Sequence, residues 1–299
     1  MNGTRVRAIA LGVFDGLHIA HRAVLDMPRR CAPLRPAVLL FDEHPLRHLQ
    51  GSAPPQLLTD ADRDDMLREM GLEILKIPFH AVMLYDPRRF FEEILLGRFG
   101  AGAVCCGYHY HFGCQGAGDP DVLRQLCGEY KLELRVVPEM DYKGAPVSST
   151  RIREALGQGN LPDANAMLGR PFGYALAVIE GAHIGRTLGA PTINQVFPEG
   201  FVVPKYGVYA SQAFVEGEWR PSVTNIGVKP TFNKSAEGAA CGGADGVCGE
   251  THVLGFAGEL YGKRVPVRLL RYLRGERRFE ALEALKEQIG KDKENAGVA

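Results

Sequence analysis

The sequence predicts two domains of different classes, an α/β domain followed by a small antiparallel β domain. The first half alternates short apolar runs with stretches of helical spacing, which is typical of a parallel sheet with crossover helices. The second half contains short β-type runs separated by Gly, Pro and Asn, which favours a small antiparallel sheet or barrel. A length of 299 residues fits two domains of roughly 100–200 residues each.

In the first half, unbroken apolar runs indicate buried strands, and apolar residues three and four apart indicate helices. Ligands of parallel sheets bind outside the carboxyl ends of the strands, so polar residues that follow a strand are the first candidates for a site. The expected strands are Arg7–Phe14, Ala37–Phe41, Leu72–Phe79, Ala103–Gly107 and Leu132–Val137, and the expected helices are Asp60–Met70, Pro87–Phe99 and Asp119–Tyr130.

The domain boundary is expected near residues 160–172, which gives domains 1–168 and 169–299. A final helix is expected at Phe279–Ile289, because Leu282, Leu285 and Ile289 share one face. The Gly- and Ala-rich segment 233–249 is expected to form a mobile loop. The expected strands of this half are Tyr174–Glu180, Gly207–Phe214, Val223–Gly227, His252–Phe256 and Val265–Leu273.

The composition excludes several classes of protein. Hydrophobic residues make up 45% and charged residues 23%, so the chain can bury a core and is not disordered. Lys+Arg and Asp+Glu are both 35, and this balance argues against a nucleic-acid partner, although a local cationic pocket for a phosphorylated ligand stays open. The apolar stretch Ala8–Phe14 is too short to span a membrane, so we expect a cytoplasmic protein with no membrane partner. The oligomeric state is left open.

The seven cysteines are expected to be reduced thiols, most of them buried. Cys105 and Cys106 are adjacent in an apolar run, which suits burial. Cys241 and Cys248 flank a Gly-rich segment, but two thiols without further matching ligands are a weak indication of zinc.

The first candidate site follows the first strand, in Gly12-Val13-Phe14-Asp15-Gly16-Leu17-His18-Ile19-Ala20-His21. His18 and His21 are three residues apart, so they share one face of a helix. A helix N-terminus directly after a strand attracts anions through its free N–H groups and its dipole. Two imidazoles there suit a triphosphate, although the pair taken alone also fits two surface histidines.

A second polar run, Val147-Ser148-Ser149-Thr150-Arg151-Ile152-Arg153, lies far downstream. Three hydroxyls at the start of a helix are normally capping residues. Capping does not require the arginines, however, and Ser149, Thr150 and Arg153 together could hold a leaving pyrophosphate.

These motifs resemble the nucleotidylyltransferase superfamily, with its H-x-G-H turn and later S-S-T-x-x-R. More narrowly, G-x-F-D-G-x-H, Phe41-Asp42-Glu43-His44-Pro45 and V-S-S-T-R-I-R look like the flavin adenylyltransferase half of bacterial bifunctional FAD synthetase. The resemblance implies a Rossmann-like domain in which the phosphate of FMN attacks the α-phosphorus of ATP, catalysed by His18, His21, Arg153 and Mg²⁺. It implies ATP contacts from Gly12, Phe14, Asp15, His18, His21, Ser149, Thr150 and Arg153, and flavin contacts from His44 and His109. For His44, a structural role satisfied by the backbone fits equally well.

The second candidate site begins at Gly185-Arg186-Thr187-Leu188-Gly189-Ala190-Pro191-Thr192-Ile193-Asn194. Glycines let a backbone approach phosphates closely. Thr192 and Asn194 are two apart, so in an extended segment they point the same way and offer hard oxygen ligands to Mg²⁺. Taken alone, the segment also fits a Gly-rich hairpin with polar turn residues.

The second half as a whole resembles riboflavin kinase. The matching segments are G-R-T-L-G-A-P-T-I-N, N-I-G-V-K-P-T-F, Glu250-Thr251-His252 and Leu260-Tyr261-Gly262. The resemblance implies that Glu250 is the general base toward the riboflavin 5′-hydroxyl, rather than an exposed loop carboxylate. It also implies ATP contacts from Gly185, Thr187, Thr192 and Asn194, Mg²⁺ held by Thr192 and Asn194, and a flavin contact from Arg274.

Both resemblances together predict a transferase that phosphorylates riboflavin to FMN and adenylylates FMN to FAD, with ATP as co-substrate. The chain departs from the family pattern at Ala20, where H-x-G-H has Gly, at His109, where Asp or Asn is usual, and at Gly255–Glu259. Two alternatives therefore stay open. One is a riboflavin kinase with an inactive or slow adenylyltransferase domain, and the other is a non-catalytic flavin-binding protein. A transferase for a different phosphate would not explain the second domain.

Overall fold

The computed structural model describes residues 5–180, 192–228, 243–256, 258–276 and 291. The chain divides into two compact units. The first unit comprises Met1–Pro54 with Asp60–Ser149, and the second comprises Pro55–Thr59 with Thr150–Ala299. The predicted division after residue 168 into two functional domains stays a prediction.

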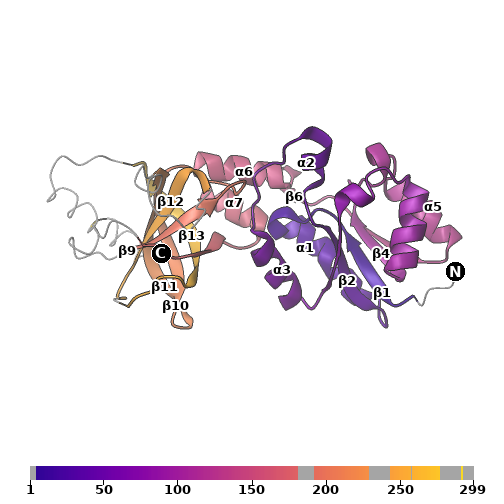
Figure 1. The fold of residues 1–299 in the computed structure, drawn as a ribbon, viewed down its shortest axis with the longest axis horizontal. Helices are drawn as coiled ribbons and strands as arrows, with labels where there is room; N and C mark the ends of the chain where they lie inside the picture. The colour runs from indigo at the N-terminus through magenta and orange to yellow at the C-terminus, as the bar shows by residue number, and fades with distance from the viewer. Residues whose placement is uncertain (1–4, 181–191, 229–242, 257, 277–290, 292–299) are drawn as a thin grey trace. The chain divides into compact units, whose positions relative to one another are not determined.

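The first unit contains a parallel sheet of five strands in the order β3-β2-β1-β4-β5, which confirms the predicted α/β class (Figure 1). The order reverses between β1 and β4, because the chain adds β2 and β3 on one side and β4 and β5 on the other. Such a switch point leaves a crevice at the carboxyl ends of the two central strands. The strands are β1 (Arg7–Leu11), β2 (Arg35–Phe41), β3 (Glu73–Ile77), β4 (Ala101–Gly107) and β5 (Glu133–Val137).

Helices cover both faces of this sheet, with α1 and α3 on one face and α5 on the other (Figure 1). A small hairpin, β6 (Asp141–Tyr142) with β7 (Ala145–Pro146), follows β5. The helices are α1 (Ile19–Asp26), α2 (Pro45–Gln50), α3 (Asp60–Glu69), α4 (Pro87–Arg89), the π-helix η4 (Phe90–Arg98) and α5 (Pro120–Glu129), with short 3₁₀ turns η1 (Asp15–Leu17), η2 (Pro28–Arg30), η3 (Phe79–Ala81) and η5 (Cys114–Gly116).

Two elements of the first unit differ from expectation. The strand expected to reach Phe14 ends at Leu11, because the chain turns at Gly12 toward η1. The helix expected at Pro87–Phe99 has one α-helical turn and then continues as a π-helix. Its wider turns are seen where the Phe99 amide donates to the Ile94 carbonyl at 3.0 Å. The four apolar side chains that suggested an α-helix are buried there nonetheless.

Four cysteines of the first unit belong to its apolar core. Cys31, Cys105, Cys106 and Cys127 are buried, and the six cysteines within the described residues are free thiols, as expected. Burial raises the pKa of Cys106 to about 12 and that of Cys127 to about 11, so these thiols stay protonated and unreactive at neutral pH.

The second unit is a six-stranded antiparallel sheet in the order β8-β13-β10-β11-β12-β9. Its two edge strands meet, because the Ile179 amide, just after β8, donates to the Asn194 carbonyl on β9 at 2.9 Å. The sheet therefore curls into a nearly closed barrel, which confirms the predicted class. Its strands are β8 (Phe172–Ala177), β9 (Thr192–Pro198), β10 (Gly207–Val215), β11 (Glu218–Val228), β12 (Gly243–Val253) and β13 (Arg264–Arg274), preceded by helices α6 (Ser149–Gln158) and α7 (Leu161–Leu168).

The fifth strand of the barrel corrects two expectations. β12 runs from Gly243 to Val253, so the strand expected at His252–Phe256 was wrong, and so was a loop extending to Gly249. A Gly-rich sequence forms a strand here because β11 and β9 both pair with it. The expected final helix at Phe279–Ile289, Gly185, Thr187 and residues 229–242 lie outside the described residues.

Packing inside the barrel explains why β12 has a glycine at position 249. Gly249 faces inward, and a Cβ at this position would overlap the hydroxyl of Tyr174, which reaches it from β8. Tyr174 is buried and packs edge-on against Phe197 at 4.8 Å between ring centroids, so the phenol ring has little room to withdraw.

We predict that Gly249→Ala destabilises the second unit by about 1–3 kcal/mol, the usual cost of overfilling a packed core. Tyr174→Phe removes the overlapping hydroxyl, so the double variant should recover part of that loss. Urea unfolding of the parent, both single variants and the double variant measures the coupling. Strictly additive effects would contradict the proposed overlap.

Candidate functional site

The turn between β1 and α1 holds the first candidate site in a strained backbone. Phe14 and Leu17 have φ angles of 55° and 44°, in the left-handed region that residues with a side chain rarely adopt. Both side chains are buried, at 1% and 0% exposure, so packing maintains the strain. Strain of this kind is costly and persists only where the surrounding structure enforces it, often at functional sites.

This turn brings His18 and His21 into direct contact. His18 is the N-cap of α1 rather than part of the helix, and its Nδ1 accepts a hydrogen bond from the His21 amide at 3.2 Å. The two rings stack with centroids 3.6 Å apart, and Phe14 lies edge-on to His21 at 5.4 Å. The expected shared face is therefore present, formed by a cap and the first helical turn.

The environment keeps His21 neutral. Burial, followed by the neighbouring His18, holds the pKa of His21 well below its usual value. Its Nδ1 is buried and has no hydrogen-bond partner within the described part of the chain. A buried ring nitrogen without a partner calls for an explanation, and a donor on a bound ligand would supply one.

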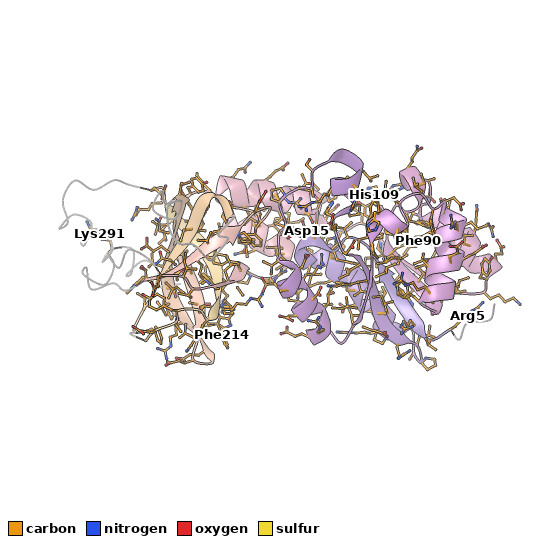
Figure 2. The ribbon with its side chains drawn as sticks, in the orientation of Figure 1. Arg5, Asp15, Phe90, His109, Phe214 and Lys291 are labelled. Carbon is orange, nitrogen blue, oxygen red and sulfur yellow. The ribbon has the colours of Figure 1, made fainter. Side chains whose placement is uncertain are left out.

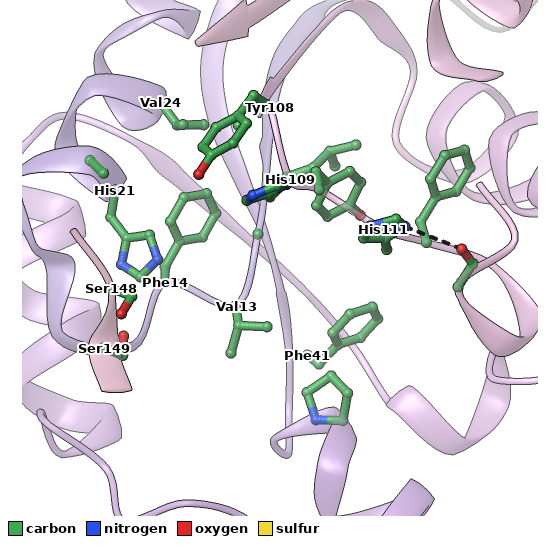
Figure 3. A pocket seen from close by; sticks show the side chains of 18 of the residues that line it. Val13, Phe14, His21, Val24, Phe41, Tyr108, His109, His111, Ser148 and Ser149 are labelled. Carbon is green, nitrogen blue, oxygen red and sulfur yellow. Dashed lines mark hydrogen bonds between the residues drawn. The ribbon is translucent and has the colours of Figure 1, made fainter. Parts of the chain in front are cut away.

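A pocket of about 690 Å³ lies at the carboxyl ends of the central strands. Figure 3 shows His21, Phe14, Ser148 and Ser149 at one end, and Phe41 and His111 at the other. The lining is mostly apolar, and its polar groups come from a few side chains and backbone atoms, as is usual for a small-molecule site. Its lining includes Leu11, Gly12, Val13, His18, Ala20, Val24, His44, Leu49, Phe79, Val82, Met83, Phe90, Tyr108, His109, Tyr110, Phe112, Pro138, Met140 and Val147.

Two further candidate histidines line the pocket, and they follow β2 and β4. His44 is the N-cap of α2, and its Nδ1 accepts from the Leu46 amide at 3.2 Å, so it both lines the pocket and satisfies the backbone. His109 is exposed, and its ring is tilted by 35° against that of Tyr108, with centroids 3.8 Å apart. Figure 2 shows its place in the first unit. The Tyr108 hydroxyl donates to the Glu139 carboxylate, which fixes the ring that His109 contacts.

The predicted phosphate residues divide between the two units. Ser149 lines the pocket, and its hydroxyl donates to the Asp15 carbonyl at 2.9 Å, a contact within the first unit. Asp15 itself is buried. Thr150 and Arg153 belong to the second unit, where the Arg153 Nε donates to the Pro55 carbonyl at 2.6 Å.

The second candidate site is a row of polar side chains across β9 and β12. The register places Asn194 opposite Glu250, and the Thr192 hydroxyl donates to Glu250 Oε1 at 3.0 Å. Asn194 is 5% exposed, with its Oδ1 3.9 Å from Cys248 Sγ. Glu250 therefore lies on a strand rather than on a loop. Arg274 ends β13, and its guanidinium donates to the Gly275 carbonyl at 3.1 Å.

The donor set of this row suits Mg²⁺. Thr192, Asn194 and Glu250 offer hydroxyl, amide and carboxylate oxygens, the hard ligands that this ion prefers. Within the described residues, no group of three or more His, Cys, Asp or Glu side chains is arranged to hold a metal ion. A dedicated cage is not required, because Mg²⁺ is usually held by one or two protein groups together with substrate phosphates.

Sequence reasoning missed much of the pocket wall. Phe79, Val82 and Met83 come from the loop after β3, and Tyr108, Tyr110 and His111 come from the segment after β4. The second group follows a predicted strand, which is a usable signal. The first group follows the edge strand β3, and nothing in the local sequence pattern predicts that this loop bends toward the pocket.

Comparison with known proteins decides the family. A family model described as FAD synthetase matches residues 2–151, and one described as riboflavin kinase matches residues 168–298. The bifunctional riboflavin kinase/FMN adenylyltransferase of Bacillus subtilis is 34% identical over 96% of this chain and 90% of its own length. The chain belongs to the bifunctional riboflavin kinase/FMN adenylyltransferase family.

Other members of this family show the same extent of similarity. The Pseudomonas fluorescens protein is 33% identical over 94% of this chain and 89% of its own length. The Escherichia coli K12 protein is 31% identical over 95% of this chain and 90% of its own length. A crystal structure described as a macrolide-efflux protein from Streptococcus pneumoniae has the same fold, with a TM-score of 0.82, 26% identity and coverage of 98% and 94%. No helix within the described residues is long and apolar enough to cross a membrane.

The depressed pKa of His21 predicts an acid-sensitive fold. In the unfolded chain this imidazole takes up a proton below about pH 6.5, whereas in the folded chain it resists protonation. Its contribution to stability is therefore present above about pH 6.5 and is lost as the pH falls toward the folded pKa. The loss is at most about 1.4 kcal/mol per pH unit.

Urea unfolding at pH 7.5 and pH 5.5 tests this assignment in the parent and in His21→Gln. The variant should lose less stability on acidification, because glutamine does not titrate. Equal losses in the two proteins would show that His21 is not the source.

Proposed function

We propose that this chain makes FAD in two ATP-dependent steps, with riboflavin kinase activity in the second unit and FMN adenylyltransferase activity in the first. The observation that carries the proposal is the presence of two separate polar sites on one chain. One is the stacked histidine pair at a helix N-terminus, and the other is the Thr192–Asn194–Glu250 row. Each site suits one of the two reactions, and both family models match.

In the adenylyl step, the FMN phosphate attacks the α-phosphorus of ATP and pyrophosphate leaves, so no protein nucleophile is required. The pocket supplies position and charge stabilisation. His18, His21 and the first N–H groups of α1 would hold the ATP phosphates, and the part of the pocket lined by His44 and His109 would take the flavin. Ser149, Thr150 and Arg153 are proposed to contact the departing pyrophosphate, alongside ATP contacts from Gly12, Phe14 and Asp15.

In the kinase step, Glu250 is proposed to accept the proton of the riboflavin 5′-hydroxyl as that oxygen attacks the γ-phosphate of ATP. The Thr192 hydroxyl holds Glu250 Oε1 and so fixes the carboxylate for this task. Mg²⁺, when bound near Thr192 and Asn194, would neutralise charge on the transferred phosphate. Arg274 is proposed to contact the flavin. The cytoplasm, which supplies ATP, is the proposed location.

We predict that Glu250→Gln lowers the kinase kcat by about 10²–10⁴-fold, because glutamine keeps the shape but cannot accept the proton. Chromatography of FMN formed from riboflavin and Mg-ATP measures this rate. Supplied FMN should still be converted to FAD. Glu218→Gln, on the exposed hairpin of the same sheet, is the matched control and should behave like the parent. A Glu250→Gln variant that works at the parent rate would show that Glu250 is not the base.

We also predict that His18→Ala lowers FAD formation from FMN by about 10²-fold or more, the scale of one lost transition-state contact. Riboflavin phosphorylation should continue at the parent rate. His48→Ala is the control, because this histidine pairs with Glu43 and is not among the pocket-lining residues. Loss of both activities in a folded His18 variant would refute the separation of the two sites.

A further inference from the structure

The seam of the barrel contains a buried amide that the chemistry described so far does not use. Gln195 is 0% exposed and lies on β9, directly after Asn194. Its Nε2 donates to the Leu176 carbonyl at 2.7 Å and to the Val265 carbonyl at 2.8 Å. One side chain on the edge strand β9 thus binds the opposite edge strand, β8, and its neighbour β13.

The Gln195 hydrogen bonds and the polar row Thr192–Asn194–Glu250 lie on opposite faces of the sheet. Side chains alternate along a strand, so Thr192 and Asn194 face one side of β9 and Gln195 faces the barrel interior. The register pairs Gln195 with Gly249 on β12, one residue before Glu250. The interior behind the row is then filled by Gln195 and by Tyr174, which lies against Gly249.

Stability alone is a weak reason for an amide at this position. A buried amide costs free energy unless all its polar atoms are hydrogen-bonded. The Gln195 Oε1 is buried and has no partner within the described residues. The inward neighbours on β9 are Ile193 and Phe197, so an apolar side chain would suit the surroundings.

We propose that Gln195 is a positioning residue, which holds the edge strand β9 across the barrel seam and thereby fixes Thr192 and Asn194 against Glu250. β9 pairs with a single strand, β12, and across the seam it receives one backbone hydrogen bond, from Ile179, within the described chain. Without Gln195, the segment that is proposed to bind Mg-ATP would rest on that bond and on one ladder. This inference rests on the proposed kinase function of the second unit.

Gln195→Met tests the proposal, because methionine keeps the length of the side chain and removes both donors. The KM for Mg-ATP in the kinase reaction should rise by about 10-fold or more. A misplacement of binding groups by about 1 Å can lower the reaction rate by about 10²-fold. The KM for riboflavin should change less than about twofold, because the proposed flavin contact, Arg274, ends β13 rather than β9. Adenylylation of supplied FMN should keep the parent rate. This split between two substrates is not expected from a general loss of folded protein.

Ser211→Ala is the matched control. Ser211 is 1% exposed on β10, and its hydroxyl bonds to Thr224 at 2.8 Å, so its loss removes a comparable buried bond away from the seam. Both variants should unfold at similar urea concentrations, but only Gln195→Met should weaken Mg-ATP. If Gln195→Met does not fold, Gln195→Asn takes its place, because the shorter amide cannot reach both carbonyls.

The proposal is overturned if a folded Gln195 variant keeps the parent KM for Mg-ATP, or if Ser211→Ala raises that KM equally. The parent protein provides the separate test of the underlying function. If the parent does not phosphorylate riboflavin with Mg-ATP, the proposed kinase function fails before the Gln195 comparison begins.

Discussion

The first unit depends on the turn that leads from the end of β1 to the start of α1, and on the packing that forces this turn into an unfavourable backbone. Phe14 and Leu17 adopt left-handed angles only because their side chains are sealed in the core. The consequence is geometric. The turn delivers His18 to the position before the helix, where its ring stacks on His21 and both line the crevice of the sheet. A relaxed turn would not place both imidazoles at the positive end of α1.

The second unit uses a different constraint, the meeting of two sheet edges. Its polar row lies on β9 and β12, and β9 would be a free edge if the barrel were open. At the seam, a backbone hydrogen bond at Asn194 and side-chain hydrogen bonds from Gln195 connect β9 to the opposite side of the barrel and hold this edge in place. The side chains that are proposed to contact the nucleotide are thereby supported both across the seam and by the β12 ladder, which keeps the row rigid.

The sequence was sufficient for the class of both units because unbroken apolar runs, such as Ala37–Phe41 with its first four residues buried, lie within the sheet. It could not reveal the π-helix, because Phe90, Phe91 and Ile94 have spacings that suit either kind of helix. It misplaced β12, because local glycine content argues against a strand while pairing with two neighbours enforces one. The contact between Thr192 and Glu250 joins residues 58 apart, and such contacts follow from register, which local pattern does not encode.

The central claim is that one chain carries both activities in separate sites, and a time course of products from riboflavin and Mg-ATP tests it most directly. Purified protein is incubated with both substrates, and riboflavin, FMN and FAD are separated and quantified at intervals. The account predicts that FMN rises first and FAD follows at its expense. FMN that accumulates with no FAD would contradict an active adenylyltransferase site, and riboflavin that stays unchanged would contradict both.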